Sequence, residues 1–318
     1  MTLFLGAYAA SPNVSGWDPE LESAYYQQLK TLPQLTGLEH PFTGALHGHD
    51  DNWFLSNIDP NWKYVFTTIP GVMNALAQNP HFGLASIDET GRAAAIAFMQ
   101  QANLAIAKLN QHLGKQAVTA IMLHSAPAQH KATSSAAALQ ASLATLLSWD
   151  WHGAQVLLEH CDTYLPEQVP SKGFLSLADE LEVLAAVNQQ LQPTKPLGVV
   201  INWGRSVLET RALDGARQHL QAAKAKGLLQ GLMFSGISDQ ATAYGAWQDS
   251  HQPIKAGSKI SIGEAGSWLT EQEVQDCLTL CNDITLTVLG LKIGVRPLTA
   301  NLDTRMALLR SQLAVFER

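Results

Sequence analysis

Short, almost wholly apolar segments alternate with longer segments of helical pattern along the whole chain, and this alternation limits the fold more than any other feature. A strand that lacks polar residues is typical of a parallel sheet covered by helices on both faces. Successive units of strand and helix are then joined by right-handed crossovers. The expected strands are residues 2–8, 37–40, 64–68, 118–123, 155–158, 198–201, 228–234 and 284–291.

The segments between these strands have helical composition, and Gly114 is a typical residue to end the longest of them. The expected helices are residues 20–31, 91–113, 134–147, 177–191, 214–225, 270–281 and 304–316. Eight parallel strands close a barrel, so the predicted fold class is α/β, a (β/α)8 TIM barrel in which residues 1–318 form a single domain. Residues 41–60 are the longest stretch without a clear pattern, and we expect them to form a lid-like loop at the catalytic end.

A doubly wound open sheet is the competing architecture, and it would bind its ligand at a switch point in the strand order. The first strand is not followed by G-x-G-x-x-G, and the sequence has no G-x-x-x-x-G-K-[ST] motif. Both absences weaken the nucleotide-binding alternative.

The charge balance excludes some partners. The net charge is −7 with a pI of about 5.8, and no cluster of Lys and Arg offers the basic face that nucleic acid needs.

No apolar run is long enough to cross a membrane, and residues 1–10 lack the basic segment of a signal peptide. Three scattered cysteines, Cys161, Cys277 and Cys281, do not make a disulfide framework. We therefore expect a cytoplasmic protein with no nucleic-acid or membrane partner. The sequence leaves the oligomeric state open, a homo-oligomer included.

Polar residues stand where the apolar strands end, and in a closed barrel these ends converge on one axis. They are Glu39, Thr67, His124, Glu159, Asn202, Ser235 and Lys292, with Arg205 and Arg296 a few residues beyond two of the ends. Neighbouring residues of a strand point to opposite faces. We expect both glutamates to point inward and His40 and His160 outward, with the reverse assignment as the alternative.

Each of these residues also has a structural interpretation. A glutamate at a strand end can simply pair with a cation, and His124 can serve as a hydrogen-bonded partner rather than a base. Lys292 in a dry barrel is costly unless it is paired, which favours an ion pair with one of the glutamates. Trp203 offers an aromatic face for a sugar ring, although core packing is the commoner use of tryptophan. The run His47-Gly48-His49-Asp50-Asp51 lacks the spacing of a metal site, so a solvated lid loop is favoured.

In strand order and strand ends, the chain resembles the xylose-isomerase-like barrel superfamily of sugar isomerases, sugar and keto-acid epimerases and endonuclease relatives. The residues that carry the resemblance are Leu158-Glu159 and Gly37-Leu38-Glu39. The chain is also similar to an uncharacterised bacterial branch of these barrels. The resemblance implies that Glu159 is a divalent-metal ligand and an acid or base.

The sequence departs from the superfamily at three strand ends. The sixth strand of metal-dependent members ends in Asp with His close behind, whereas this chain has Asn202-Trp203-Gly204-Arg205. Ser235 stands where the seventh strand offers His or Asp, and Lys292 where the eighth offers Glu. A hard divalent ion prefers several carboxylates or imidazoles. The ligand set is therefore degraded, with Glu159 its one retained member, and a divalent metal stays an open alternative.

These residues point to an isomerase or epimerase that acts on a carbohydrate, a sugar acid or a sugar phosphate by proton transfer next to a carbonyl. The catalytic candidates are Glu159 as base, Glu39 or His124 as acid, and Lys292 in the electrostatic role of a metal. The substrate-binding candidates are Asn202, Trp203, Arg205, Ser235 and Arg296, the two arginines gripping an anionic group. The alternatives are a glycoside hydrolase on the same two glutamates, a lyase that uses Lys292, and a non-catalytic sugar-binding protein without the metal site.

Overall fold

The strands close into one parallel barrel, which confirms the predicted fold class. The computed structural model describes residues 2–317, in which eight strands pair in chain order and β8 returns to β1. The strands are β1 (Phe4–Leu5), β2 (Gly37–Pro41), β3 (Lys63–Thr67), β4 (Val118–Leu123), β5 (Gln155–Glu159), β6 (Gly198–Asn202), β7 (Leu229–Phe234) and β8 (Val288–Leu291).

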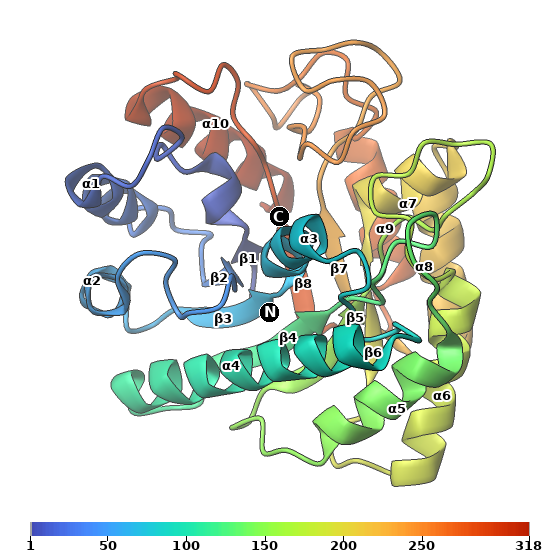
Figure 1. Cartoon of the computed structure of the whole chain (residues 1–318). Helices are drawn as coiled ribbons and strands as arrows, with labels where there is room; N and C mark the ends of the chain where they lie inside the picture. The colour runs from blue at the N-terminus through green and yellow to red at the C-terminus, as the bar shows by residue number, and fades with distance from the viewer. Residues whose placement is uncertain (1, 318) are drawn as a thin grey trace.

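Helices surround this barrel, with the long α4 running across it in Figure 1. They are α1 (Pro19–Leu29), α2 (Asp51–Asn57), α3 (Ile69–Gln78), α4 (Glu89–Leu113), α5 (Ala136–Leu147), α6 (Leu177–Leu191), α7 (Trp203–Thr210), α8 (Gly215–Ala225), α9 (Glu271–Leu280) and α10 (Leu302–Leu313), with 3-10 turns η1 (Ala7–Ala10) and η2 (Ala314–Phe316). α4 begins where the Asp88 carboxylate accepts the Gly91 amide, and it ends at Gly114 in the left-handed conformation with φ of 63°. This is the stop that the sequence predicts.

Two hydrophobic layers follow from the alternation of side chains along the strands. The inner layer fills the barrel and consists of Phe4, Val65, Ala120, Met122, Leu157, Val200, Met233 and Val288. The outer and much larger layer lies between the strands and the helices. The barrel is therefore packed along its axis below the strand ends, as in other barrels of this type.

Some predicted boundaries are wrong. The first strand ends at Leu5 rather than at residue 8, because the chain turns and the Ala9 amide bonds to the Gly6 carbonyl. The eighth begins at Val288 rather than at 284, because the Ile284 amide bonds back to Cys281 in a turn. Residues 41–60 contain the short helix α2, and two further helices, α3 and α7, begin directly after β3 and β6.

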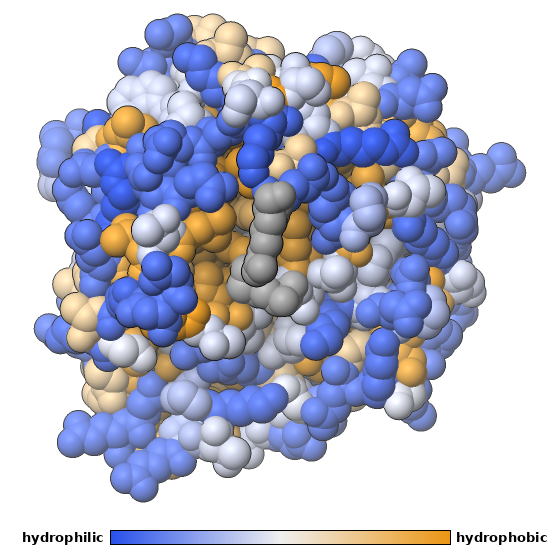
Figure 2. Space-filling view, turned by 180° about the vertical axis from the view of Figure 1, so that it is seen from behind, coloured by the Kyte–Doolittle hydropathy of each residue, from blue (hydrophilic) through white to orange (hydrophobic). Residues whose placement is uncertain are grey.

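The outer surface is mixed. Seen from behind, most of the face is hydrophilic, and hydrophobic residues gather towards its middle (Figure 2). Among residues 2–317, no helix combines the length and the apolar character that a bilayer span needs.

Candidate active site

Strand register places both predicted glutamates inside the barrel. Glu39 stands beside Val65, and Glu159 stands beside Val200, and both valines belong to the inner layer. Residues that pair across neighbouring strands share a face of the sheet. Glu39 is 1% exposed and Glu159 is fully buried. Both carboxyl groups therefore lie above the apolar filling of the barrel.

Three side chains bind the Glu159 carboxylate. His124 Nε2 lies 2.9 Å and Arg205 Nη1 lies 2.8 Å from its Oε2, while Asn202 Nδ2 donates to Oε1 at 3.1 Å. These partners come from the ends of β4 and β6 and from the first turn of α7. Both oxygens of Glu159 are thus occupied by protein groups.

A further set of hydrogen bonds holds these partners in place. Thr68 Oγ1 lies 3.1 Å from His124 Nδ1, and Ser235 Oγ donates to Asn202 Oδ1 at 3.2 Å. Glu159 lies at hydrogen-bond distance from His124 Nε2 and the Thr68 hydroxyl from Nδ1, so both nitrogens of the His124 ring have a partner. Ser235, predicted as a substrate-binding residue, therefore orients Asn202.

Electrostatics keep Glu159 ionised. Burial alone would raise the pKa of its carboxyl, but the positive charges of Arg205 and Lys292 and the hydrogen bond from His124 hold that pKa well below its usual range. Burial also lowers the pKa of His124, to about 4, so its imidazole is neutral at pH 7. Glu159 is a fixed anion under these conditions.

Arg205 connects Glu159 to an outer acid. Its Nε donates to Asp249 Oδ2 at 3.1 Å, and Lys172 Nζ lies 3.1 Å from the same oxygen. Although burial would raise the pKa of Asp249, the cations Lys172 and Arg205 hold it well below its usual range. Neither Asp249 nor Lys172 was predicted, because they lie in loops after β7 and β5, at no fixed distance from a strand end.

Glu39 and Lys292 form a second buried ion pair. Lys292 Nζ lies 2.6 Å from Glu39 Oε1 and 5.5 Å from the centre of the Tyr8 ring. Within residues 2–317, the pair leaves both Glu39 oxygens and Lys292 Nζ without a hydrogen bond of good geometry, and the buried Thr67 hydroxyl is also unbonded. Buried polar groups are nearly always hydrogen-bonded, so these atoms are candidates for contacts with a ligand.

The pKa of Glu39 differs from that of Glu159. Burial raises the pKa of the Glu39 carboxyl, and the nearby Glu159 charge adds to this, while Lys292 acts in the opposite direction. The pKa of Lys292 is raised despite its burial, because Glu39, Tyr8 and Glu159 surround it. Lys292 is therefore an ammonium at neutral pH.

A cavity of about 300 Å³ reaches Glu39. Its wall includes Tyr8, Trp17 and Tyr26 from the first units of the barrel and His47 and His49 from the segment 41–60. The His49 ring stacks on Trp17 with 5.2 Å between ring centres. A larger surface pocket of about 670 Å³ lies at the rim beside Asp249 and Trp247, and neither Glu39 nor Glu159 lines it. The cavity at Glu39 is therefore the candidate ligand site.

Two predicted substrate-binding residues lie apart from these networks. Arg296 packs over the ring of Tyr244, 5.2 Å from its centre, and donates to the Val295 carbonyl. Trp203 is fully buried as the first residue of α7, and its indole Nε1 has no hydrogen-bond partner within residues 2–317. Of the two predicted arginines, only Arg205 contacts a catalytic candidate.

The residues around Glu159 do not fit a divalent cation. Its oxygens already contact His124, Arg205 and Asn202, and the Arg205 guanidinium carries a positive charge and no acceptor atom that could bind a metal. The strand ends that would supply further ligands carry Asn202, Ser235 and Lys292, of which Lys292 brings a positive charge. Arg205 and Lys292 supply the positive charge at this place in the barrel.

The sequence as a whole matches one described family. Residues 4–308 match a domain of unknown function, DUF4862. The chain belongs to the DUF4862 family. An uncharacterized protein of Salmonella typhimurium is 33% identical to this DUF4862 chain over 317 residues, which cover 99% of this chain and 96% of that protein.

Solved structures of low identity show the fold of this DUF4862 protein. A xylose isomerase domain containing protein from Salmonella typhimurium has a TM-score of 0.62 at 11% identity, covering 100% of this chain and 98% of that one. A D-tagatose 3-epimerase-like protein has a TM-score of 0.57 at 12% identity, covering 98% and 97%. The DUF4862 chain has the fold of xylose isomerase-like barrels, as the sequence resemblance predicted.

Proposed function

We propose that this protein isomerises or epimerises a small polyhydroxylated carbonyl compound, such as a sugar, a sugar acid or a sugar phosphate. One observation carries the proposal. Glu39, paired with the buried Lys292, lines a cavity with aromatic walls, and its carboxylate oxygens and the Lys292 ammonium have no hydrogen bonds of good geometry in the described chain. A base and a cation held side by side are what enolisation requires.

In this mechanism the Glu39 carboxylate removes the proton from the carbon next to the substrate carbonyl. The electron pair of the broken C–H bond moves to the carbonyl oxygen, where the Lys292 ammonium stabilises the negative charge. Return of the proton from Glu39 to the neighbouring carbon, together with transfer of the hydroxyl proton to the former carbonyl oxygen, gives the isomer. Protonation of the same carbon from its other face by a solvent water, with Glu39 giving its own proton up to solvent, gives an epimer. The raised pKa of Glu39 suits this role, since an efficient base has a pKa near the working pH.

Glu159 is better suited to positioning than to proton transfer. Its low pKa, its hydrogen bonds with His124 and Asn202 and its ion pair with Arg205 make it a permanent anion that orients these three side chains. The sequence favoured Glu159 as the base. The surroundings of the two glutamates instead support Glu39 as the base and Glu159 as a positioning residue. Two carboxyl groups whose surroundings drive their pKa values apart commonly have different roles in one site.

The segment 41–60 is proposed as the lid of this site. His47 and His49 line the cavity, and the stacking of His49 on Trp17 closes one side of it. The Asp50 carboxylate accepts the amides of Asn52 and Trp53, which starts α2 next to the cavity wall. A short helix inside the segment gives a lid a fixed shape.

Solvent exchange tests the proposal directly. The protein is incubated in D2O with a panel of aldoses, ketoses, sugar acids and their phosphates, and deuterium at the carbon next to the carbonyl is followed by NMR. We expect incorporation with the wild type and a loss of at least about 100-fold in Glu39→Gln, the scale of a removed general base. Glu89→Gln, a change of the same kind at an exposed helix end, should exchange at the wild-type rate.

Two outcomes would contradict the proposal. Saturable ligand binding without deuterium incorporation would identify a sugar-binding protein. Deuterium incorporation that persists in Glu39→Gln but is lost in Glu159→Gln would return the base to Glu159.

A further inference from the structure

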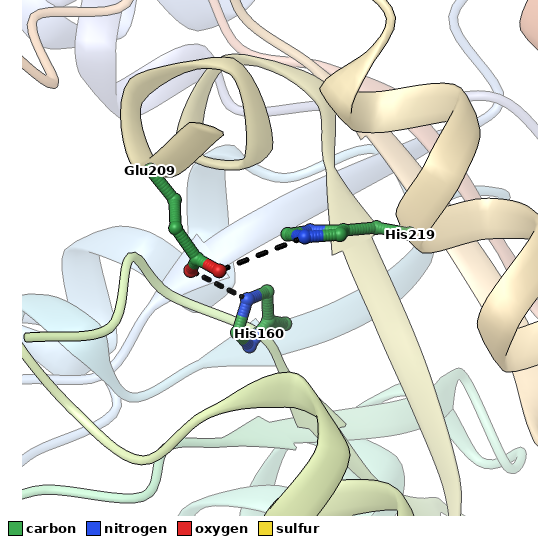
Figure 3. Close-up of side chains that lie close together, drawn as sticks. All are labelled: His160, Glu209 and His219. Atoms are coloured by element: carbon green, nitrogen blue, oxygen red, sulfur yellow. Dashed lines mark hydrogen bonds and ion pairs between the residues drawn. The ribbon is translucent and has the colours of Figure 1, made fainter. Parts of the chain in front are cut away.

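A second cluster of ionisable residues lies outside the barrel. His160 follows β5 and points away from the barrel axis, opposite to Glu159. Its Nε2 lies 3.1 Å from Glu209 Oε2 near the end of α7, and His219 Nε2 on α8 lies 3.6 Å from Glu209 Oε1. Figure 3 shows the Glu209 carboxylate between the two imidazole rings. None of these residues contacts Glu39 or Lys292.

The donor atoms have the spacing of metal ligands. One donor atom from each of the three side chains lies within 4.8 Å of the others. Zinc binds imidazole nitrogen and carboxylate oxygen at about 2.0–2.2 Å, so ligands at tetrahedral corners are roughly 3.4 Å apart. The two imidazoles approach different oxygens of the Glu209 carboxylate, at 3.1 Å for Oε2 and 3.6 Å for Oε1, and these distances lie on either side of this value. Small side-chain adjustments bring all three donors onto one ion.

Hydrogen bonds behind the rings turn the correct nitrogens inward. His160 Nδ1 lies 2.7 Å from Glu180 Oε2, and His219 Nδ1 lies 3.0 Å from Ser206 Oγ. Glu209 Oε2 in turn accepts the Thr163 amide at 2.9 Å. Metal-binding histidines commonly have this arrangement, in which one ring nitrogen bonds a carboxylate or other polar group and the other faces the ion.

The cluster opens to solvent on one side. Glu209 and His219 line a groove of about 560 Å³ between α6 and α8, whose other walls include Leu177, Leu181 and Ala222. The side chains of Glu209 and His219 are each 12% exposed, whereas that of His160 is fully buried. A fourth ligand, such as water, can therefore reach an ion from the groove.

We propose that His160, Glu209 and His219 bind a divalent transition-metal ion of the zinc type, with its fourth position open to the groove between α6 and α8. Two imidazoles and one carboxylate suit such an ion and disfavour Mg²⁺ or Ca²⁺, which prefer oxygen ligands. This site lies outside the barrel and does not depend on the function proposed for Glu39. Zn²⁺ bound there links the end of β5, which carries Glu159, to α7, which carries Arg205, and to the neighbouring α8.

Cobalt substitution tests the site. The full chain without an affinity tag is freed of metal with a chelator and titrated with Co²⁺, whose visible absorption reports four-coordinate binding. Zn²⁺ should then displace the Co²⁺ and remove the absorption. We expect one equivalent in the wild type and in His112→Asn, a matched change at an exposed histidine of α4. Binding should weaken at least about 100-fold in His219→Asn and in Glu209→Gln, since each removes a direct ligand.

A comparison with the barrel interior makes the result decisive. Glu159→Gln should retain the Co²⁺ equivalent, because Glu159 is not a ligand in this proposal. Failure of the wild type to bind an equivalent of Co²⁺ or Zn²⁺ would overturn it and identify the cluster as ion pairs only. Equal affinity in His219→Asn and His112→Asn would overturn it as well, and so would loss of binding in Glu159→Gln alone. Circular dichroism of each variant verifies the fold, and Glu209→Gln serves where His219→Asn does not fold.

Discussion

At the scale of single residues, the ion pair of Lys292 and Glu39 is a fully buried charge pair at the mouth of the barrel. Neither side chain is exposed, and neither has a hydrogen bond of good geometry to compensate its desolvation within residues 2–317. Such a pair adds little net stability, but removing one partner leaves an uncompensated charge in the interior. The pair therefore costs stability and is expected to persist for its chemistry.

Replacing Lys292 by methionine tests this balance. Lys292→Met alone should lower the free energy of unfolding by about 3–5 kcal/mol, because Glu39 loses its counter-charge. The double change Lys292→Met with Glu39→Gln should recover most of this loss. Urea denaturation of the single and double variants measures both quantities. If the double variant is no more stable than the single one, the unpaired Glu39 carboxylate does not destabilise the folded state of Lys292→Met.

His40 gives the stability of the protein a dependence on acid pH. Its ring packs against Phe54 with 4.6 Å between ring centres, and burial lowers its pKa to about 4. The unfolded chain, with a histidine pKa near 6.5, takes up the proton first. The contribution of His40 is therefore complete above about pH 6.5 and is lost as the pH falls towards 4. From pH 7 to pH 4.5 we expect the wild type to lose about 2–3 kcal/mol more than His40→Gln, at about 1.4 kcal/mol per pKa unit.

Denaturant unfolding at a series of pH values measures that difference. His112→Gln, at an exposed position, should follow the wild-type curve. If the free energy of unfolding of the wild type and of His40→Gln falls in parallel below about pH 6.5, a group other than His40 causes the loss of stability in acid.

The sequence pointed to the polar residues at the strand ends, but to few of their contacts and to none of the tyrosines that line the cavity at Glu39. Polar residues that interrupt apolar strands, such as Glu39, Glu159 and Asn202, are visible as breaks in a pattern. The partners Asp249 and Lys172 lie in loops, and Tyr8 lies in a turn that the sequence assigns to a strand. Which glutamate is free and which is bound depends on these tertiary neighbours, so the sequence alone could not order their pKa values.

At the scale of elements, the predicted strands and helices are confirmed, and the errors are strand and helix boundaries and the three short helices α2, α3 and α7. The ranges predicted for β4 and α6 agree with the structure residue for residue. The helices α3 and α7 were missed because they follow a strand without a connecting loop, and Pro70 and Gly71 at the start of α3 resemble a turn. Asn202 is the last residue of β6 and the N-cap of α7, so one residue serves both elements and the site.

The contact between β8 and β1 closes the barrel and leaves no space for a side chain at Gly290. A methyl group there would lie 2.5 Å from Met233 Sδ and 2.7 Å from the Phe4 carbonyl oxygen. We expect Gly290→Ala to lower the free energy of unfolding by about 1–3 kcal/mol, the usual cost of overpacking. Gly48→Ala, where the new methyl would meet only Thr43 Oγ1 at 3.6 Å, should be nearly neutral. Equal melting temperatures for the two variants would contradict the tight closure.

At the scale of the whole molecule, closure makes each strand depend on two neighbours, including the pair formed by the two ends of the sheet. A barrel built this way has no strand that can separate without exposing the inner layer. The alternation of apolar and helical segments predicts this architecture, because local pattern and global topology agree.

We expect one cooperative unfolding transition for this single barrel. Far-UV circular dichroism follows the helices, and tryptophan fluorescence follows Trp203, Trp151 and the other indoles, several of which are buried. Their thermal transitions should coincide within error. Separate midpoints would show that part of the chain unfolds as an independent unit and would contradict the single-domain description.

The inner layer of eight side chains, which includes Phe4 and Val288, also determines by which route a ligand can reach the site. Because it plugs the barrel below Glu39 and Glu159, a reactant finds no passage through the axis and must leave by the mouth through which it entered. If the protein catalyses the proposed reaction, product must therefore leave the site before the next substrate enters. A site with a single opening suits the reversible interconversion of two similar compounds, since both compounds bind in it and can enter and leave by the same opening.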